Sequence, residues 1–180
     1  MNRLARRRIA TTTALTLTPL VLAMCRGETR NDDTDYDHVM SFDTTRMRLA
    51  RTNDTLALHV ELAVKPEQQS MGLMERRRLA SNAGMLFVYD STQAPDASFW
   101  MYRTRIPLDI AFADSAGVIR SIRSMAPCPT DLPQACPNYR PDVPYRYALE
   151  VNAGYFARHR IVVGNTLVLS DLPSPGTRKP

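Results

Sequence analysis

Residues 55–64 read TLALHVELAV, and this stretch decides the fold. Apolar side chains occupy every second position, a pattern that is typical of a strand with one buried face. The predicted buried face comprises Leu56, Leu58, Val60, Leu62 and Val64, and the other face carries Ala57, His59, Glu61 and Ala63. The chain around this stretch is therefore expected to build a sheet.

Shorter segments of the same kind recur downstream. They predict strands at residues 85–89, 98–102, 108–113, 118–125, 145–151, 161–163 and 166–169. One short helix is predicted from Pro66 to Arg76, and a second, capped by Asn152, ends at His159. Gly164-Asn165 suits a tight hairpin. Many short strands with two brief helices predict a β-rich, single α+β domain, a compact closed or half-open barrel.

The amino terminus has the three-part shape of an export signal. Four arginines within residues 3–8 precede an uncharged stretch, residues 9–24, that ends at Cys25. Residues 22–25, LAMC, resemble a bacterial lipobox, although Met24 stands where Gly, Ala or Ser is usual. Lipidation of Cys25 is therefore expected, with ordinary cleaved secretion or an uncleaved anchor as alternatives. The protein is expected to be exported, periplasmic or extracytoplasmic, and anchored to the membrane as a lipoprotein.

Charge is divided unevenly along the chain. The whole sequence carries +5, but loss of residues 1–24 would leave 19 basic against 18 acidic residues. Residues 26–45 are acidic and poor in apolar side chains, and they are predicted to form a disordered tether. Residues 46–170 are the predicted domain, and residues 171–180 a flexible tail. The domain keeps 15 basic against 11 acidic residues, which permits an anionic ligand or contact with lipid headgroups.

Two cysteines remain after Cys25 is assigned to the export signal. Cys128 and Cys136 lie eight residues apart in a proline-rich loop, and disulfides persist in exported proteins. We predict that they are bonded to each other. A metal pair is the alternative, but two thiols without a nearby histidine make a poor zinc site. A redox role fits less well, because the spacing is not Cys-x-x-Cys.

Several strings together resemble one protein family. VELAVKPEQQSMGLMERRRL (60–79), GMLFVY (84–89), FWMYRTRIPLDIAFADSAGVI (99–119), APCP (126–129) and YALEVNAGYFARHRIVVGN (147–165) are similar, in order and spacing, to the uncharacterised ACR family, domain of unknown function 192. The resemblance implies a small, often exported, single-domain α+β protein and no established reaction. Where the family usually has Lys-Asn-Thr, this sequence has Tyr102-Arg103-Thr104. The usual Gly-Asp is replaced by Gly164-Asn165, which still suits a turn.

Two carboxylates interrupt otherwise apolar strands. Asp109 and Glu150 could form an acid/base pair on neighbouring strands. They could equally accept backbone hydrogen bonds or pair with Arg76 or Arg105, because a buried carboxylate is costly unless it has a partner. The three histidines, His38, His59 and His159, have no partner at metal-ligand spacing, so neither a metal nor a cofactor is expected.

Trp100 and Met101 are adjacent, and such a pair usually packs in a core. The functional alternative is an aromatic wall of a pocket in which Arg103 or Arg105 supplies positive charge. Candidate ligand-binding residues are Arg76, Trp100, Met101, Arg103, Asp109 and Glu150. We expect a membrane-tethered, extracytoplasmic binding or accessory domain for a small anionic or cell-envelope ligand rather than an enzyme, with nucleic acid not expected as a partner. The alternative is a cell-envelope hydrolase that uses Asp109 and Glu150.

Overall fold

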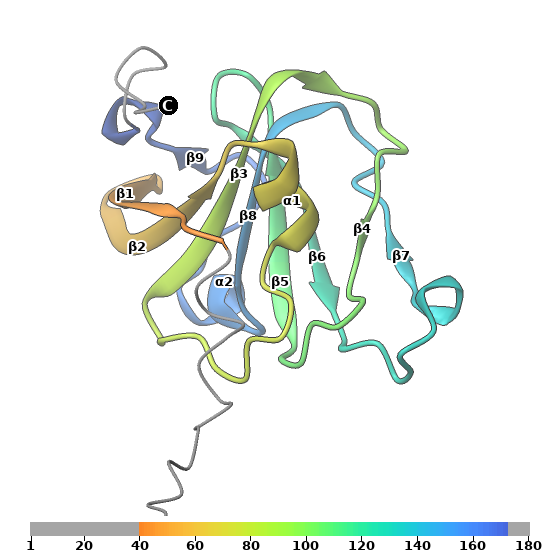
Figure 1. Cartoon of the computed structure of the whole chain (residues 1–180). Helices are drawn as coiled ribbons and strands as arrows, with labels where there is room; N and C mark the ends of the chain where they lie inside the picture. The colour runs from red at the N-terminus through yellow and green to blue at the C-terminus, as the bar shows by residue number, and fades with distance from the viewer. Residues whose placement is uncertain (1–39, 173–180) are drawn as a thin grey trace, which may run out of the picture. The chain divides into compact units, whose positions relative to one another are not determined.

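The computed structural model describes residues 40–172 of the chain, and Figure 1 shows their arrangement. The strands are β1 (Asp43–Ala50), β2 (Thr55–Ala63), β3 (Ala83–Gln93), β4 (Phe99–Trp100), β5 (Leu108–Ala113), β6 (Ile119–Met125), β7 (Asn138–Tyr139), β8 (Tyr145–Asn152) and β9 (Thr166–Leu167). The helices are α1 (Pro66–Met71) and α2 (Tyr155–Arg158), with single 3₁₀ turns at Pro133–Ala135 and Leu169–Asp171. The expected export signal and Cys25 lie outside the described residues, as does most of the expected tether and tail.

Seven strands form one strongly curled sheet in the order β6-β5-β8-β3-β2-β1-β9, and β4 pairs with β7 separately. Only β2 and β3 among the paired strands run parallel, because α1 and the turns after it carry the chain back to the starting end of the sheet. The prediction of a β-rich α+β barrel with two short helices is confirmed.

The short strand β9 links the two edges of this half-barrel. Leu167 pairs with Leu49 of β1, and Thr166 also forms a bridge with Val118, just before β6. The backbone N–H of Leu167 donates to the carbonyl of Gly117 at 2.8 Å. A predicted hairpin between residues 161–163 and 166–169 is therefore wrong: residues 161–163 form no strand, and β9 pairs with distant parts of the chain.

Two apolar cores lie on opposite faces of the sheet. The enclosed core includes residues from β1, β2, β3, β5, β8 and β9 together with α2, such as Leu49, Leu58, Val151 and Tyr155. The outer core lies on the other face, beneath α1, the turns after it and β4, and it includes Leu73, Met85, Met101, Ile110 and Phe112. Each of the central strands therefore buries side chains in both directions, as the six buried residues of β5 show.

Three boundaries differ from the sequence-based expectation. The helix from Pro66 ends at Met71, where Gly72 follows with φ of 50°, rather than at Arg76. Asn152 does not cap α2, because its side-chain amide donates to the carbonyls of Leu79 and Ala80 instead. Strand β1 begins at Asp43, inside the stretch expected to be tether, and pairs along its whole length with β2.

Candidate functional site

Two aromatic side chains pack against each other at the end of β4. Trp100 is 44% exposed, and its ring centroid lies 5.3 Å from that of Tyr102, with the planes tilted by 38°. Met101 between them points the other way, is 1% exposed and packs in the outer core. The adjacent Trp and Met thus separate: the methionine belongs to the core and the tryptophan to the surface.

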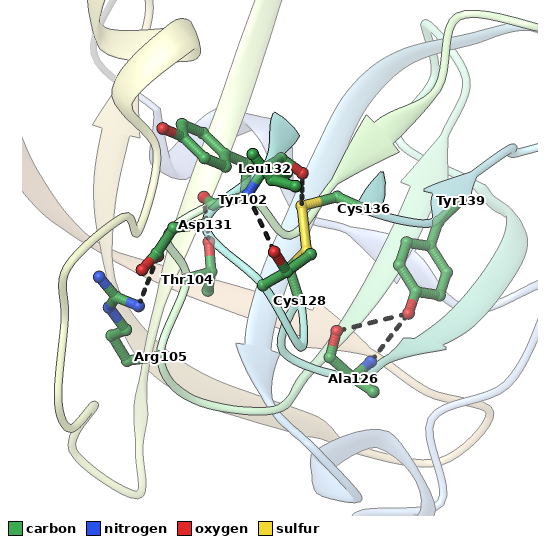
Figure 2. Close-up of a disulfide and its surroundings, with 10 residues drawn as sticks. Tyr102, Thr104, Arg105, Ala126, Cys128, Asp131, Leu132, Cys136 and Tyr139 are labelled. Atoms are coloured by element: carbon green, nitrogen blue, oxygen red, sulfur yellow. Dashed lines mark hydrogen bonds and ion pairs between the residues drawn. A yellow bond between two sulfur atoms is a disulfide. The ribbon is translucent and has the colours of Figure 1, made fainter. Parts of the chain in front are cut away.

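A loop closed by a disulfide lies beside this aromatic pair. The predicted disulfide is present, with Cys128 and Cys136 joined across a Cα–Cα distance of 5.2 Å. Trp100 pairs across strands with Asn138, two residues after the bridge. Figure 2 shows Tyr102 and Leu132 among the side chains around the disulfide, and Leu132 is 64% exposed. We call Trp100, Tyr102 and Leu132 the aromatic rim.

Ion pairs hold the segment after the rim. Glu75, in the turns that follow α1, accepts hydrogen bonds from the guanidinium groups of Arg103 and Arg105. The hydrogen bond from Arg105, together with that from Arg103, holds the pKa of Glu75 below its usual range. Arg105 also contacts Asp131 at 3.2 Å, within the disulfide loop (Figure 2). These contacts tie three separate segments together beside the aromatic rim.

The register of β5 and β8 places the two predicted acid/base carboxylates on opposite faces of the sheet. Glu150 lies opposite Ile110, which belongs to the outer core, whereas Asp109 lies opposite Val151, which belongs to the enclosed core. Successive side chains of a strand point to opposite faces, so the sheet separates the two carboxyl groups. The proposed pairing of Asp109 with Glu150 as acid and base on one substrate is therefore wrong.

Glu150 is a buried acid without a hydrogen-bonding partner among residues 40–172. Its side chain lies between Met85 and Ile110 of the neighbouring strands and is 4% exposed. Burial raises its pKa to about 8, so the carboxyl group is mostly protonated at neutral pH. Burial also raises the pKa of Tyr89 well above its usual value and that of Tyr145 to about 12. Glu150 is thus an acid kept neutral by its apolar surroundings.

Asp109 and Arg76 each have a partner of their own. Asp109 is 3% exposed and accepts a hydrogen bond of 2.8 Å from the hydroxyl of Ser124 on β6. Arg76 forms two hydrogen bonds with Glu61 of β2, at 3.0 and 2.6 Å. The expected ion pairs from Arg76 or Arg105 to Asp109 or Glu150 are absent among the described residues.

The structure therefore brings together only part of the predicted site. Arg103 and Arg105, a few residues after Trp100, share the carboxylate of Glu75. Arg76 follows Glu75 directly but is paired with Glu61 of β2. Asp109 and Glu150 are buried on opposite faces of the sheet. Sequence reasoning missed Tyr102, Leu132, Glu75 and Asp131. Tyr102 had a readable signal, because it lies two residues after Trp100 and so projects to the same side of an extended segment.

The described histidines lie apart from the rim. His59 is exposed on β2, and the ring centroid of His159 lies 4.4 Å from that of Tyr155. Within residues 40–172, no group of three or more His, Cys, Asp or Glu side chains is placed to hold a metal ion. No helix in this part of the chain is long and apolar enough to cross a membrane.

A family model described as Uncharacterized ACR, domain of unknown function 192, matches residues 48–169. The chain belongs to the uncharacterised ACR family. This confirms the resemblance seen in the sequence, and the matched residues run from β1 to the turn after β9. The family description assigns no reaction to its members.

Two solved structures are similar to this member of the ACR family. A Sinorhizobium meliloti protein, given the provisional description of a transcription regulator, is 37% identical, with a TM-score of 0.62 over 71% of this chain and 95% of its own. A Novosphingobium aromaticivorans protein of unknown function is 28% identical, with a TM-score of 0.62 over 72% of this chain and 88% of its own. Comparison with curated proteins gave no match.

Proposed function

We propose that this ACR-family chain is a membrane-tethered, extracytoplasmic binding or accessory domain that holds a cell-envelope ligand against the aromatic rim. The observation that carries the proposal is the exposed ring of Trp100, which packs against the half-buried ring of Tyr102. Large aromatic side chains provide much apolar contact area with few rotatable bonds, and they are enriched at binding surfaces. Leu132 extends this apolar area onto the disulfide loop.

The loop beside the rim is held in place by a disulfide and by hydrogen bonds. The disulfide closes the loop, and the hydroxyl of Tyr139 both accepts from the backbone N–H of Ala126 at 3.0 Å and donates to its carbonyl at 3.4 Å. A surface that is already ordered loses less conformational entropy on binding than a flexible one. The rim is therefore organised to bind without rearranging its loop.

Two arginines beside the rim favour a ligand that carries an anionic or hydrogen-bond-accepting group. The side chains of Arg103 and Arg105 are 40% and 44% exposed while their guanidinium groups contact Glu75. A guanidinium group carries five N–H donors, so Arg105 retains donors beyond its contacts with Glu75 and Asp131. The ligand that fits best has an apolar face for Trp100 and a nearby anionic or hydrogen-bond-accepting group.

The disulfide and the amino-terminal sequence support the location. Disulfides are rare in reducing compartments and persist outside the cytoplasm. The arginines, uncharged stretch and Cys25 of residues 3–25 are typical of an exported lipoprotein. For the same reason, the regulator description of the Sinorhizobium protein is not extended to this chain. Intact mass of the membrane fraction should show a lipid-sized increment on Cys25, and an unmodified Cys25 would contradict the anchor.

The ligand can be tested through the protein's own fluorescence, because Trp100 is its single tryptophan. Muropeptides released from bacterial sacculi should shift its emission to shorter wavelength and saturate. Tyr102→Ala should weaken this binding, whereas Val163→Ala, at a valine 57% exposed elsewhere, should leave it unchanged. A flat titration, or equal binding by the two variants, would overturn the assignment of the rim to such a ligand.

A further inference from the structure

Exposed basic side chains occur on the outer side of β1 and β2 and in the segment that follows Glu75. Arg46 of β1 lies directly opposite His59 of β2 in the strand register, and both are exposed. Their neighbours Met47 and Leu58 point into the enclosed core. Arg46 and His59 therefore share the face of this strand pair that is turned away from that core.

The segment of residues 76–82 lies alongside the same face. Arg76 at its start is bound to Glu61 of β2, and the carbonyl of Asn82 at its end accepts the backbone N–H of His59 at 3.0 Å. Glu61 and His59 are two residues apart, so both ends of the segment are fixed to one short stretch of β2. Arg77 and Arg78, which are exposed, lie between these two attachments.

Arg46, Arg77 and Arg78 have no acidic partner among the described residues, whereas the nearest other arginines in the sequence do. Arg48 is paired with Asp171 at 2.8 Å, and Arg76 is paired with Glu61. In residues 40–172, no carboxylate lies within ion-pair distance of Arg46, Arg77 or Arg78. We call Arg46, His59, Arg77 and Arg78 the arginine face.

We infer that the arginine face rests on the anionic headgroups of a lipid bilayer. Its side chains are exposed and spread over a strand pair and a neighbouring segment, so they match an array of phosphate groups better than one converging anion. Each arginine close to an anionic surface strengthens membrane association about fivefold. The inference rests on the membrane location proposed above, but not on the ligand of the aromatic rim.

The position of the arginine face allows it to contact a membrane while the aromatic rim binds a ligand. β1 and β2 lie on the left of Figure 1, and β4 and β7 lie on the right. The described chain enters β1 at Asp43, three residues before Arg46, so a tether preceding it joins the domain beside the arginine face. Contact of this face with headgroups leaves Trp100 accessible to a ligand.

Vesicle co-sedimentation of the full chain tests the inference. The probes are phosphatidylcholine vesicles with and without about 30% phosphatidylglycerol, an anionic lipid that gives the vesicle surface a negative potential. Replacing Arg46, Arg77 and Arg78 together by Gln should reduce partitioning onto the anionic vesicles about 100-fold. Partitioning onto the neutral vesicles should not change, because the amino-terminal segment is the same in both proteins.

Arg140→Gln is the matched control, because Arg140 is exposed after β7 and has no acidic partner in the described part of the chain. It should bind anionic vesicles nearly as the parent does. Replacement of the same three arginines by Lys should retain most of the binding, which separates loss of charge from loss of folding. Equal partitioning of the parent and the Gln variant would overturn the inference.

Inorganic phosphate distinguishes a membrane from a single anion. Displacement of the parent from vesicles by millimolar phosphate, at constant ionic strength, would identify a discrete phosphate site and contradict the bilayer. Muropeptide titration of the triple Gln variant should match the parent, since Trp100 is untouched. Failure of the arginine face and failure of the aromatic rim therefore give different results.

Discussion

Glu75 and Arg103 hold each other through backbone and side chain at once, and both have a left-handed backbone. The N–H of Glu75 donates to the carbonyl of Arg103 at 2.8 Å, and the guanidinium group of Arg103 donates to the carboxylate of Glu75. Their φ angles are 59° and 54°. This region is costly for most L residues and is best tolerated by Gly, Asn and Asp. The double contact therefore fixes two strained turns beside the aromatic rim.

Asparagine tolerates the left-handed backbone at position 103 better than a β-branched residue does. Arg103→Asn and Arg103→Val both remove the guanidinium group, so their difference isolates the backbone preference. We expect the Asn variant to have a free energy of unfolding about 1–2 kcal/mol higher than that of the Val variant. Urea denaturation at pH 7 measures it. Equal free energies of unfolding of the two variants would show that the left-handed backbone at position 103 does not favour Asn over Val.

Glu150 should make the protein less stable as the pH rises. Its pKa is about 8 in the folded protein against an ordinary value of 4.5, so the folded state binds the proton more tightly than the unfolded state. Its stabilising proton is fully in place below about pH 4.5 and is lost as the pH approaches 8. Glu150→Gln cannot ionise, so the variant should gain stability relative to the parent over this interval, by up to about 1.4 kcal/mol per pH unit.

Parallel urea denaturation of the parent and the Glu150→Gln variant at pH 5, 6, 7 and 8 gives this difference. Titrations of all other groups are common to both proteins and cancel. Arg105→Gln is the control, because it alters a charged, exposed side chain without touching Glu150. A constant difference between the parent and Glu150→Gln across this pH range would contradict the buried, neutral acid.

Two serines of β6 should respond oppositely to the same substitution. Ser124 donates to the buried Asp109, whereas the hydroxyl of Ser121 is buried and has no hydrogen-bonding partner within residues 40–172. Ser124→Ala should lower the free energy of unfolding by about 1 kcal/mol, and Ser121→Ala should leave it unchanged or raise it. Thermal and urea unfolding compare them directly. A larger loss in the free energy of unfolding for Ser121→Ala than for Ser124→Ala would mean that the Ser121 hydroxyl forms a hydrogen bond in the folded protein in solution.

The disulfide should contribute measurably to stability. Closing the loop between Cys128 and Cys136 is worth about 2.5 kcal/mol on the chain-entropy model, so the double change to Ser should lower the free energy of unfolding by about that amount. Peptide mapping without reductant should join the two cysteines in the parent. Two alkylatable thiols in the exported protein would show that the bridge does not form there.

Alternation within short segments is enough to predict β2, β5 and β8, because burial of one face is a local property of the sequence. It does not predict β1, whose first residues fall in the acidic stretch expected to be tether. The relation between Asp109 and Glu150 is not local. It depends on the register in which β5 meets β8, and a shift by one residue would place the two carboxylates on the same face. A single sequence does not contain that register, so it cannot show that the two carboxylates lie on opposite faces of the sheet.

Long-range pairing explains the other differences. Gly164 and Asn165 have the composition of a hairpin, but their backbone groups bind Ile119, and β9 continues to β1. Trp100 and Met101 are likewise adjacent in the sequence, yet only the fold determines which of the two side chains lies in the outer core. The local sequence indicates which segments form turns and strands. Their partners depend on how distant parts of the chain meet in the fold.

The position of β9 near the end of the chain sets an order on folding. Thr166 and Leu167 supply the contacts that link β1 to the start of β6, and 13 residues follow them. A nascent or truncated chain that stops before Thr166 leaves two unpaired sheet edges at once, and such edges invite aggregation. Completion of the barrel must therefore wait for β9, which is made after every other strand of residues 40–172.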